Sequence, residues 1–319
     1  MAILTDYMEK KLLDHAFGQA EFSTPSTLYL GVSTTAFVDS DNGTTAAAKE
    51  PSSSNAYARQ RLDNVVDLYT SDFDIRNNAS IDFPTVTNSN WGNVQYWGIF
   101  DGSGTSANML MHGSFSSGTT VNVGDQFRIS SGDFEITFPS SIGGDGHWRQ
   151  QIAWFLGFDY TSSPTDNLRF YYYTKANSGY SGFYDEALYL ALSTSAFTDD
   201  IYGSSIELST SGTGYARVKI LDADDGSVDY FSAAATASGT TILTNDVAVV
   251  FPEATSSWGT VSHFAIFRGA TSGSYDASAL GTGNQARHPL FRGALSSSVS
   301  ISSGDRLRFA ANGLTIEAS

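Results

Sequence analysis

An internal repeat constrains this chain more than any other feature, because one fold must accommodate both copies. Five blocks of sequence recur in the same order along the 319 residues. The blocks and their second occurrences are Leu28–Phe37 with Leu188–Phe197, Tyr57–Arg59 with Tyr215–Arg217, Phe83–Pro84 with Phe251–Pro252, Trp91–Phe100 with Trp258–Phe267, and Gly124–Arg128 with Gly304–Arg308. A period this long indicates a duplicated domain rather than a solenoid, whose units span about 20–50 residues.

The spacing between the two copies predicts where the domains and loops lie. It grows from 160 residues at the first block to 180 at the last, so insertions lie between the blocks, as loops do on a shared scaffold. Ser, Gly and Pro cluster after the first copy, which is typical of a linker. We predict a first domain at residues 1–138, a linker at 139–146, a second domain at 147–319, and a long Gly- and Ser-rich loop of the second copy at 270–288.

The recurring blocks have the pattern of β-strands. Residues 28–33, Leu-Tyr-Leu-Gly-Val-Ser, place apolar side chains at every second position. Pro84 and Pro252 are predicted to end strands, because proline lacks an amide donor. Gly124-Asp125 and its repeat predict turns. With hydrophobic residues at 41% and charged residues at 16%, these patterns predict a mainly β fold of two tandem β-sandwich-like domains.

Each domain is predicted to open with a short amphipathic helix. Apolar side chains recur at every fourth position of residues 4–16, with Thr5 or Asp6 as the N-cap and Gly18 as the stop. Residues 148–157 repeat this pattern before the second copy, with an apolar face of Trp148, Ile152, Phe155 and Leu156.

Charge and cysteine content exclude several classes of function. The 33 acidic and 17 basic residues give a formal net charge of −16, which disfavours binding to nucleic acid or to an anionic membrane. The absence of cysteine excludes disulfides, thiolate metal sites and thiol catalysis. Residues 1–11 lack the pattern of a secretory signal, and no apolar run approaches the roughly 20 residues of a membrane span. We therefore expect synthesis in a cytoplasm.

At several of these blocks the chain resembles a family of small phage virion proteins, commonly labelled tail fibre proteins. The resemblance rests on a Leu-Tyr-Leu-Gly strand from Leu28, a Tyr-Ala-Arg element from Tyr57, a Trp-Gly-Asn-Val strand from Trp91, and a helix with Tyr7, Lys11, Leu12, Leu13, Asp14, His15, Phe17 and Gly18. It covers nearly all of residues 1–138 and, more loosely, 147–319. Members of the family usually have one such domain, so the tandem arrangement is a departure.

The resemblance implies a non-catalytic structural component of a phage virion, tail or tail-fibre associated, made in the host cytoplasm. Its partners would be other virion proteins and further copies of itself, with no cofactor. A capsid cement or decoration protein is one alternative, and a carbohydrate-binding adhesion module that recognises a host surface glycan is another. The chain lacks Gly-x-Ser-x-Gly and nucleotide-binding glycine motifs, and an enzyme that cuts surface polysaccharide is the least favoured interpretation.

No metal site is predicted with any strength. The five histidines are scattered, and we expect them to be surface residues of helices and strands. Asp39, Asp41 and Glu50 fit positions one, three and twelve of a calcium loop, but position six is Thr44 instead of the required glycine. A second acidic turn contains Asp222, Asp224 and Asp225 without a glutamate at the proper spacing. We interpret both as solvated turns.

Residues that recur are expected to serve the fold, and residues that occur once are expected to serve contacts. We predict that Trp91 and Trp258 are buried against Ile99/Phe100 and Ile266/Phe267, and that Arg59 and Arg217 pair with an acidic side chain or reach a neighbouring subunit. Aromatic side chains bring large contact area to an interface. The candidate interface is an aromatic segment without counterpart in the first copy: Phe170, Tyr171, Tyr172, Tyr173, Tyr180, Phe183 and Tyr184.

Overall fold

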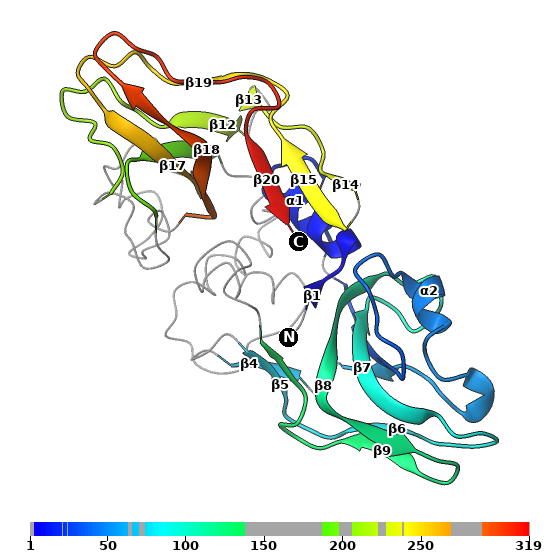
Figure 1. Cartoon of the computed structure of the whole chain (residues 1–319). Helices are drawn as coiled ribbons and strands as arrows, with labels where there is room; N and C mark the ends of the chain where they lie inside the picture. Colours follow the sequence, from blue (N-terminus) through cyan, green and yellow to red (C-terminus); the bar gives the residue numbers. More distant parts are fainter. Residues whose placement is uncertain are drawn as a thin grey trace.

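The computed structural model of the chain describes residues 3–20, 22–23, 25–62, 66–69, 74–137, 187–197, 206–222, 228–237, 239–268 and 289–318. In Figure 1 the strands gather into two lobes, one from the first half of the chain and one from the second half. We call the lobe of strands β1–β10 repeat one and the lobe of strands β11–β20 repeat two.

Repeat one consists of three small antiparallel sheets. Its strands are β1 (Ile3–Leu4), β2 (Tyr29–Ser33), β3 (Gln60–Arg61), β4 (Val66–Tyr69), β5 (Asp74–Asn77), β6 (Ile81–Thr85), β7 (Gly92–Phe100), β8 (Met109–Val121), β9 (Gln126–Ile129) and β10 (Glu135–Thr137). Its helices are α1 (Asp6–Ala16), α2 (Gly43–Ala47) and the 3-10 helix η1 (Ser53–Asn55). The sheets have the strand orders β1-β8-β7-β2-β3, β10-β5-β4 and β6-β9.

Repeat two is built in the same way. Its strands are β11 (Leu188–Ser193), β12 (Val218–Asp222), β13 (Val228–Asp229), β14 (Ala235–Ala237), β15 (Thr240–Thr244), β16 (Val249–Val250), β17 (Gly259–Arg268), β18 (Phe291–Ile301), β19 (Arg308–Phe309) and β20 (Thr315–Ala318). They form sheets with the orders β13-β12-β11-β17-β18, β14-β15-β20 and β16-β19.

The strand orders confirm that the described halves share one fold. The order β8-β7-β2-β3 matches β18-β17-β11-β12, and each repeat adds a three-stranded and a two-stranded sheet made from corresponding strands. The large sheets differ only in their fifth strand, which is β1 beside β8 in repeat one and β13 beside β12 in repeat two. The prediction of a mainly β protein with two tandem β-sandwich-like domains is therefore confirmed.

The layers of each sandwich are held together by apolar side chains that alternate along the strands. In repeat one, Trp97 of β7 contacts Phe134, just before β10, at 5.2 Å between ring centroids. Phe115 of β8 contacts Phe127 of β9 at 6.0 Å. β9 and β15 show the alternating burial of strands with one buried face. β11 is buried at every position, because a loop residue, Phe197, covers the outer face of the sheet.

The predicted turns and strand ends are largely observed. Gly124 and Gly304 both adopt a φ of +90°, which only glycine adopts readily, and the strands β9 and β19 follow. β16 ends at Val250, before Pro252, as predicted. The predicted strand end at Pro84 is wrong, because β6 continues to Thr85. The register is irregular between Asp82 and Thr85, so the missing amide donor falls where the ladder is already interrupted.

Helix α1 begins at the predicted place. Thr5 is its N-cap, and the Thr5 hydroxyl accepts a hydrogen bond from the Met8 amide at 3.3 Å. The helix ends at Ala16, and Gly18 follows with a φ of +68°. The helix expected at residues 148–157 and the linker expected at 139–146 lie outside the described residues. Within the described part of the chain, no helix is long and apolar enough to cross a membrane.

Candidate functional site

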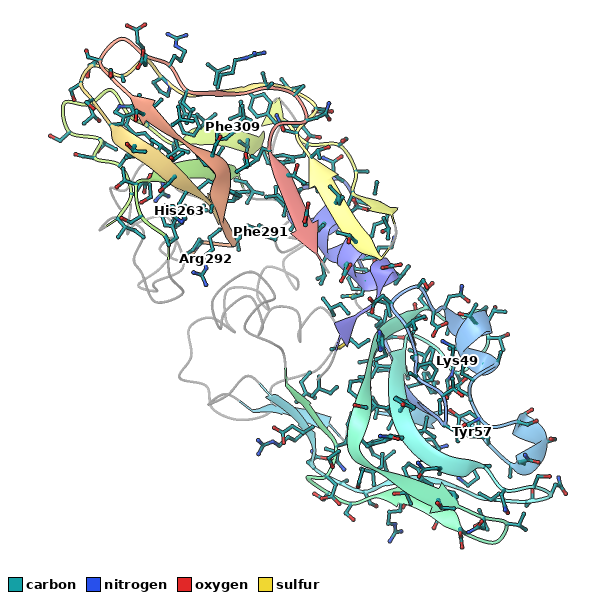
Figure 2. The ribbon with its side chains drawn as sticks, viewed as in Figure 1. Lys49, Tyr57, His263, Phe291, Arg292 and Phe309 are labelled. Carbon is teal, nitrogen blue, oxygen red and sulfur yellow. The ribbon has the colours of Figure 1, made fainter. Side chains whose placement is uncertain are left out.

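Polar side chains that recur in both copies meet in a buried cluster. In repeat one, the Tyr57 hydroxyl accepts a hydrogen bond from the Val32 amide at 2.9 Å and donates one to Glu50 Oε1 at 2.7 Å. Arg59 donates to both Glu50 oxygens, from Nε and from Nη2, each at 2.9 Å. Its guanidinium also lies over the Phe100 ring, with Cζ 3.4 Å from the centroid. Tyr57 lies inside the first lobe (Figure 2).

Repeat two contains the same cluster. The Tyr215 hydroxyl accepts from the Leu192 amide at 2.9 Å and donates to Glu207 Oε1 at 2.9 Å. Arg217 donates to Glu207 from Nε at 2.9 Å and from Nη2 at 2.6 Å, and its Cζ lies 4.0 Å from the centroid of Phe267. Of the two alternatives predicted for the recurring arginines, the pairing with an acidic side chain is confirmed in both repeats.

The environment of these clusters determines what they do. Burial, followed by the charge of the neighbouring glutamate, raises the pKa of Tyr57 and of Tyr215 well above the usual value for a phenol. Both hydroxyls therefore stay protonated and donate. The ion-paired Arg and Glu side chains are at most 5% exposed. Because the charged atoms bind one another out of reach of solvent, the clusters tie loops to the central strands rather than meet a substrate.

The recurring tryptophans complete an aromatic trio in each repeat. Trp91 is 7% exposed and Trp258 is 5% exposed, so the predicted burial is confirmed. Trp91 contacts the rings of Tyr57 at 5.3 Å and Phe83 at 6.1 Å, each edge to face. Trp258 contacts the equivalent rings at 5.4 and 6.5 Å. The predicted contacts with Phe100 and Phe267 are wrong, because each of these rings belongs to a separate apolar cluster on the outer face of its sheet.

The carboxylates of the calcium-like spacing have separate protein partners. Asp39 is bonded to His112 at 2.8 Å, and Asp41 pairs with Lys49 and accepts from the Val38 amide. Glu50 belongs to the arginine cluster. The interpretation of this segment as a solvated turn is therefore too simple, since all three carboxylates bond to other groups of the protein. The second acidic turn, Asp222 to Asp225, has no described side chains.

The histidines also differ from the prediction of surface residues. His15 and His112 are buried, and His15 Nδ1 accepts a hydrogen bond from the Phe22 amide at 3.0 Å. His263 lies in β17, as predicted, with Nδ1 2.8 Å from the Ser262 hydroxyl. His147 and His288 lie outside the described residues. Within the described ranges, no group of three or more potential metal ligands comes together.

The predicted candidate interface and the predicted long loop both lie outside the described residues. They are the aromatic segment of Phe170, Tyr171, Tyr172, Tyr173, Tyr180, Phe183 and Tyr184, and the loop of residues 270–288. The structure therefore leaves both predictions as they were.

Two other sets of residues were missed by sequence reasoning, although a signal was present. Glu50 and Glu207 precede the recurring tyrosines by seven and eight residues. Asn77 and Asn245 each precede the Phe-Pro block by six residues, and both are buried. The Asn77 amide donates to two backbone carbonyls at 2.8 and 2.7 Å, and Asn245 makes the equivalent pair at 2.8 and 2.7 Å. Each asparagine therefore ties the turn after β5 or β15, in the three-stranded sheet, to the turn after β9 or β19, in the two-stranded sheet.

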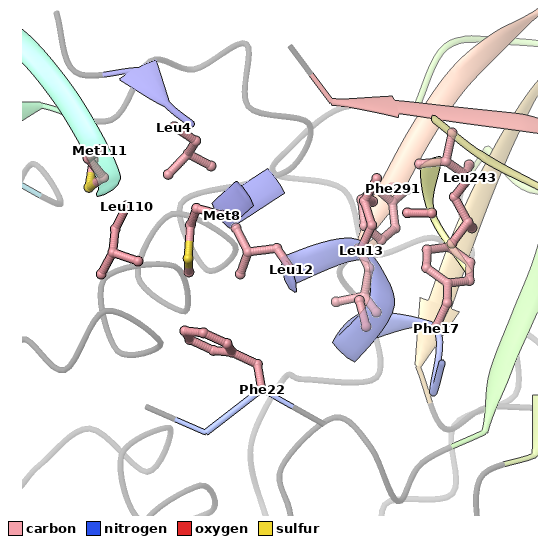
Figure 3. Close-up of a cluster of buried hydrophobic side chains, with 14 of the residues drawn as sticks. Leu4, Met8, Leu12, Leu13, Phe17, Phe22, Leu110, Met111, Leu243 and Phe291 are labelled. Atoms are coloured by element: carbon pink, nitrogen blue, oxygen red, sulfur yellow. The ribbon is translucent and has the colours of Figure 1, made fainter. Parts of the chain in front are cut away.

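Helix α1 lies at the junction of the two repeats, which the sequence did not reveal. Its N-cap is tied to repeat one, where the Thr5 hydroxyl donates to the Met109 carbonyl at 2.6 Å. Its C-terminal half faces repeat two, where Phe17 lies 4.7 Å from Phe231 and 5.4 Å from Phe291, between ring centroids. Figure 3 shows Leu13 and Phe17 beside Leu243 and Phe291, with Leu4 and Met8 on the side of Leu110 and Met111.

An unusual acidic group is buried in this junction. Glu9 of α1 is 3% exposed, and its Oε2 atom has no hydrogen-bond partner among the described residues. Burial raises the pKa of Glu9 to about 7, and the charges of Asp39 and Asp6 act in the same direction against a hydrogen bond from Thr241. Burial, with Asp39, also raises the pKa of Asp6. The surroundings of Glu9 and Asp6 in the junction therefore disfavour the ionised form of both carboxyl groups.

The fold and the duplicated clusters define a tandem-repeat β-sandwich protein with one set of buried polar contacts per repeat. The chain belongs to the family described as podophage GP4 fiber I protein gp80, whose pattern matches residues 3–137 and again residues 185–317. The two matches coincide with the two repeats, which confirms the resemblance to phage tail fibre proteins and the duplication. The protein is therefore a virion-associated phage structural protein. No curated protein matches the chain.

Proposed function

We propose that the protein is a non-catalytic structural component of the phage virion, tail or tail-fibre associated, and acts through protein–protein contacts. The match of a fibre family over both repeats carries this proposal. It favours a position in the tail over that of a capsid cement protein. The partners would be other virion proteins and further copies of the chain.

The duplicated clusters support assembly over glycan adhesion and over catalysis. The tryptophans that recur in both copies are buried against Tyr57, Phe83 and their counterparts, so their faces are not available to stack on a sugar ring. The recurring charged groups are paired and buried, whereas a glycosidase needs two carboxyl groups about 5–10 Å apart that a substrate can reach. What recurs in this chain serves to fold each repeat.

Particle composition tests this role. We expect mass spectrometry of purified particles to find the protein in a fixed ratio to other tail proteins, and particles from a phage that lacks the gene to lack one tail density by cryo-electron microscopy. A protein that is abundant in infected cells but absent from purified particles would contradict the proposal. A density on the capsid surface would favour the cement alternative.

Solution chemistry tests the non-catalytic part. The purified protein is expected to turn over no polysaccharide, peptide or nucleotide. EDTA is expected to leave its Tm unchanged, because Asp39 and Glu50 are already bonded to His112 and Arg59. A lower Tm in EDTA that calcium restores would instead assign a metal to this loop.

Within this role, the aromatic segment of residues 168–184 is our candidate contact surface. This segment has no counterpart in the first copy, and aromatic residues are enriched in protein interfaces. Replacing Tyr171, Tyr172 and Tyr173 with Ser is expected to reduce incorporation into particles more than it lowers the Tm. Equal incorporation of the triple variant and the parent would remove this segment from the interface.

A further inference from the structure

The first residues of the chain dock as one unit against both repeats. We call residues 3–17 the N-terminal segment; it consists of β1 and α1 with its C-cap, Phe17. β1 extends the edge of the large sheet of repeat one, where Ile3 pairs with His112 and Leu4 with Met111. α1 then reaches strands β14 and β15 of repeat two. The segment therefore adds a strand to one repeat and a helix to the other, two established modes of docking a peptide.

The apolar contact of this segment is extensive. Met8, Leu12, Leu13 and Phe17 are at most 4% exposed. The Phe17 ring contacts Phe231 and Phe291 of repeat two, as described above. Burial of apolar side chains of this size favours the docked state of the segment. Phe17, Phe231 and Phe291 belong to one apolar cluster, so the segment forms part of the core of a repeat that lies far along the sequence.

Polar contacts set the orientation of the helix. Lys10 Nζ donates to the Ala234 carbonyl at 2.6 Å, and the Ala234 amide donates to Asp14 Oδ1 at 2.7 Å. The pair of Lys10 and Asp14, one turn apart, thus satisfies both backbone groups of one residue in repeat two. Gln19, just beyond the segment, donates to Asp229 at 3.0 Å. A helix in another register or direction would lose these bonds, so the site is specific for this sequence.

All contacts between the segment and the two repeats are non-covalent, and only residues 18–28 connect it to β2. A connector of that length spans up to about 36–40 Å when extended. The docking site is therefore identical whether the segment comes from the same chain or from a neighbour within reach. An element with these properties can be exchanged between copies at little cost.

We propose that this junction site is the self-assembly site of the protein, and that it accepts the N-terminal segment of a second copy. In an isolated chain the site holds the chain's own segment. Where copies are concentrated, each site takes the segment of its neighbour, and each chain gives its own segment to the next. Such an exchange either closes a dimer or continues into an open row. The proposal rests on the assembly role above and names its partner.

The absence of cysteine allows a direct test with single thiols. Gln19 and Asp229 are in contact near the surface, so Gln19→Cys and Asp229→Cys disturb the core little. Both substitutions in one full-length chain are expected to be joined by a short bismaleimide into an internally linked monomer. Two chains, each carrying one substitution, are then unfolded together, refolded at high concentration and treated alike. Exchange is expected to give a covalent dimer, in a yield that rises with concentration.

A matched pair controls for random collision. Gln19→Cys is mixed with Val123→Cys, which is exposed just beyond the end of β8, whereas β1 pairs with the start of that strand. The Gln19/Asp229 mixture is expected to give several times more covalent dimer than this pair. Equal yields, with internal linkage in the double variant, would overturn the exchange, as would a double variant that fails to link. Neither result bears on whether the protein is found in particles, so the two proposals fail separately.

Discussion

The two repeats reach the same buried cluster through different loops. In repeat one, Glu50 follows helix α2, whereas in repeat two Glu207 forms an isolated bridge with Ser193. The glutamate precedes the tyrosine by seven residues in one repeat and by eight in the other. The hydrogen bonds from tyrosine to glutamate nevertheless measure 2.7 and 2.9 Å. Divergence after the duplication has changed the connections and kept the contacts, which indicates that the contacts are what each repeat requires.

The comparison predicts that removing the arginine from either repeat lowers the free energy of unfolding by the same amount. Arg59→Ala or Arg217→Ala leaves a buried glutamate unpaired, which costs about 3–5 kcal/mol. The loss of the stacked guanidinium adds to this. Urea unfolding measures the loss, and hydrogen exchange at the Val32 and Leu192 amides, which bond to the cluster tyrosines, locates it.

A surface arginine provides the control for this pair. Arg128 forms an exposed ion pair with Asp82, so Arg128→Ala is expected to leave the unfolding midpoint unchanged. A large loss for Arg59→Ala with a small one for Arg217→Ala would show that the two clusters have diverged in importance, despite their equal geometry.

The tryptophans sharpen the comparison, because their removal is expected to cost a similar amount of stability for a different physical reason. Trp91→Ala or Trp258→Ala removes a buried indole and leaves a cavity, at about 3–5 kcal/mol. Each also loses one hydrogen bond, from the indole to Asn55 at 3.1 Å or to Thr213 at 2.9 Å. Trp91→Phe should recover much of the loss, because it refills most of the cavity. Thermal unfolding of the three single variants tests this, and a neutral Trp91→Ala would contradict the assigned packing.

Patterns that repeat along the sequence could be predicted, and contacts between distant segments could not. The alternation in residues 28–33 and the Gly-Asp turns are local, so the sequence predicts them directly, and it narrows the N-cap of α1 to Thr5 or Asp6, of which the structure shows Thr5. The pairing of Glu50 with Arg59 left a signal, since both residues recur, but the one-residue difference in spacing concealed it. The side chains of α1 fit either sheet equally well by periodicity, because an amphipathic face does not specify which apolar surface it meets. Only the fold shows that Phe17 packs on Phe231 and Phe291.

The smallest predicted effect concerns Glu9, which has no counterpart among the described residues of repeat two. Its pKa lies at about 7, raised from the ordinary 4.5 by burial. Below pH 4.5 the carboxyl is protonated in both the folded and the unfolded chain, so it causes no penalty. Between about 4.5 and 7 only the folded chain keeps the proton, and the free energy of unfolding therefore falls as the pH rises. Above 7 the full penalty remains.

Glu9→Gln removes this ionisation, so the variant should be more stable than the parent at pH 8, by about 1–2 kcal/mol after allowance for solvent screening, and similar to it at pH 4.5. Measuring the Tm of both proteins across this range tests the sign. Glu317→Gln, at an exposed position of β20, is the matched control and should show no such trend. Because Glu9 lies on α1 against Thr241 of repeat two, the penalty acts on the junction rather than on either sandwich. Protease cleavage of the connector at residues 18–28 should therefore increase with pH in the parent and not in Glu9→Gln. Equal cleavage of both proteins would show that the charge of Glu9 does not affect the docking of α1.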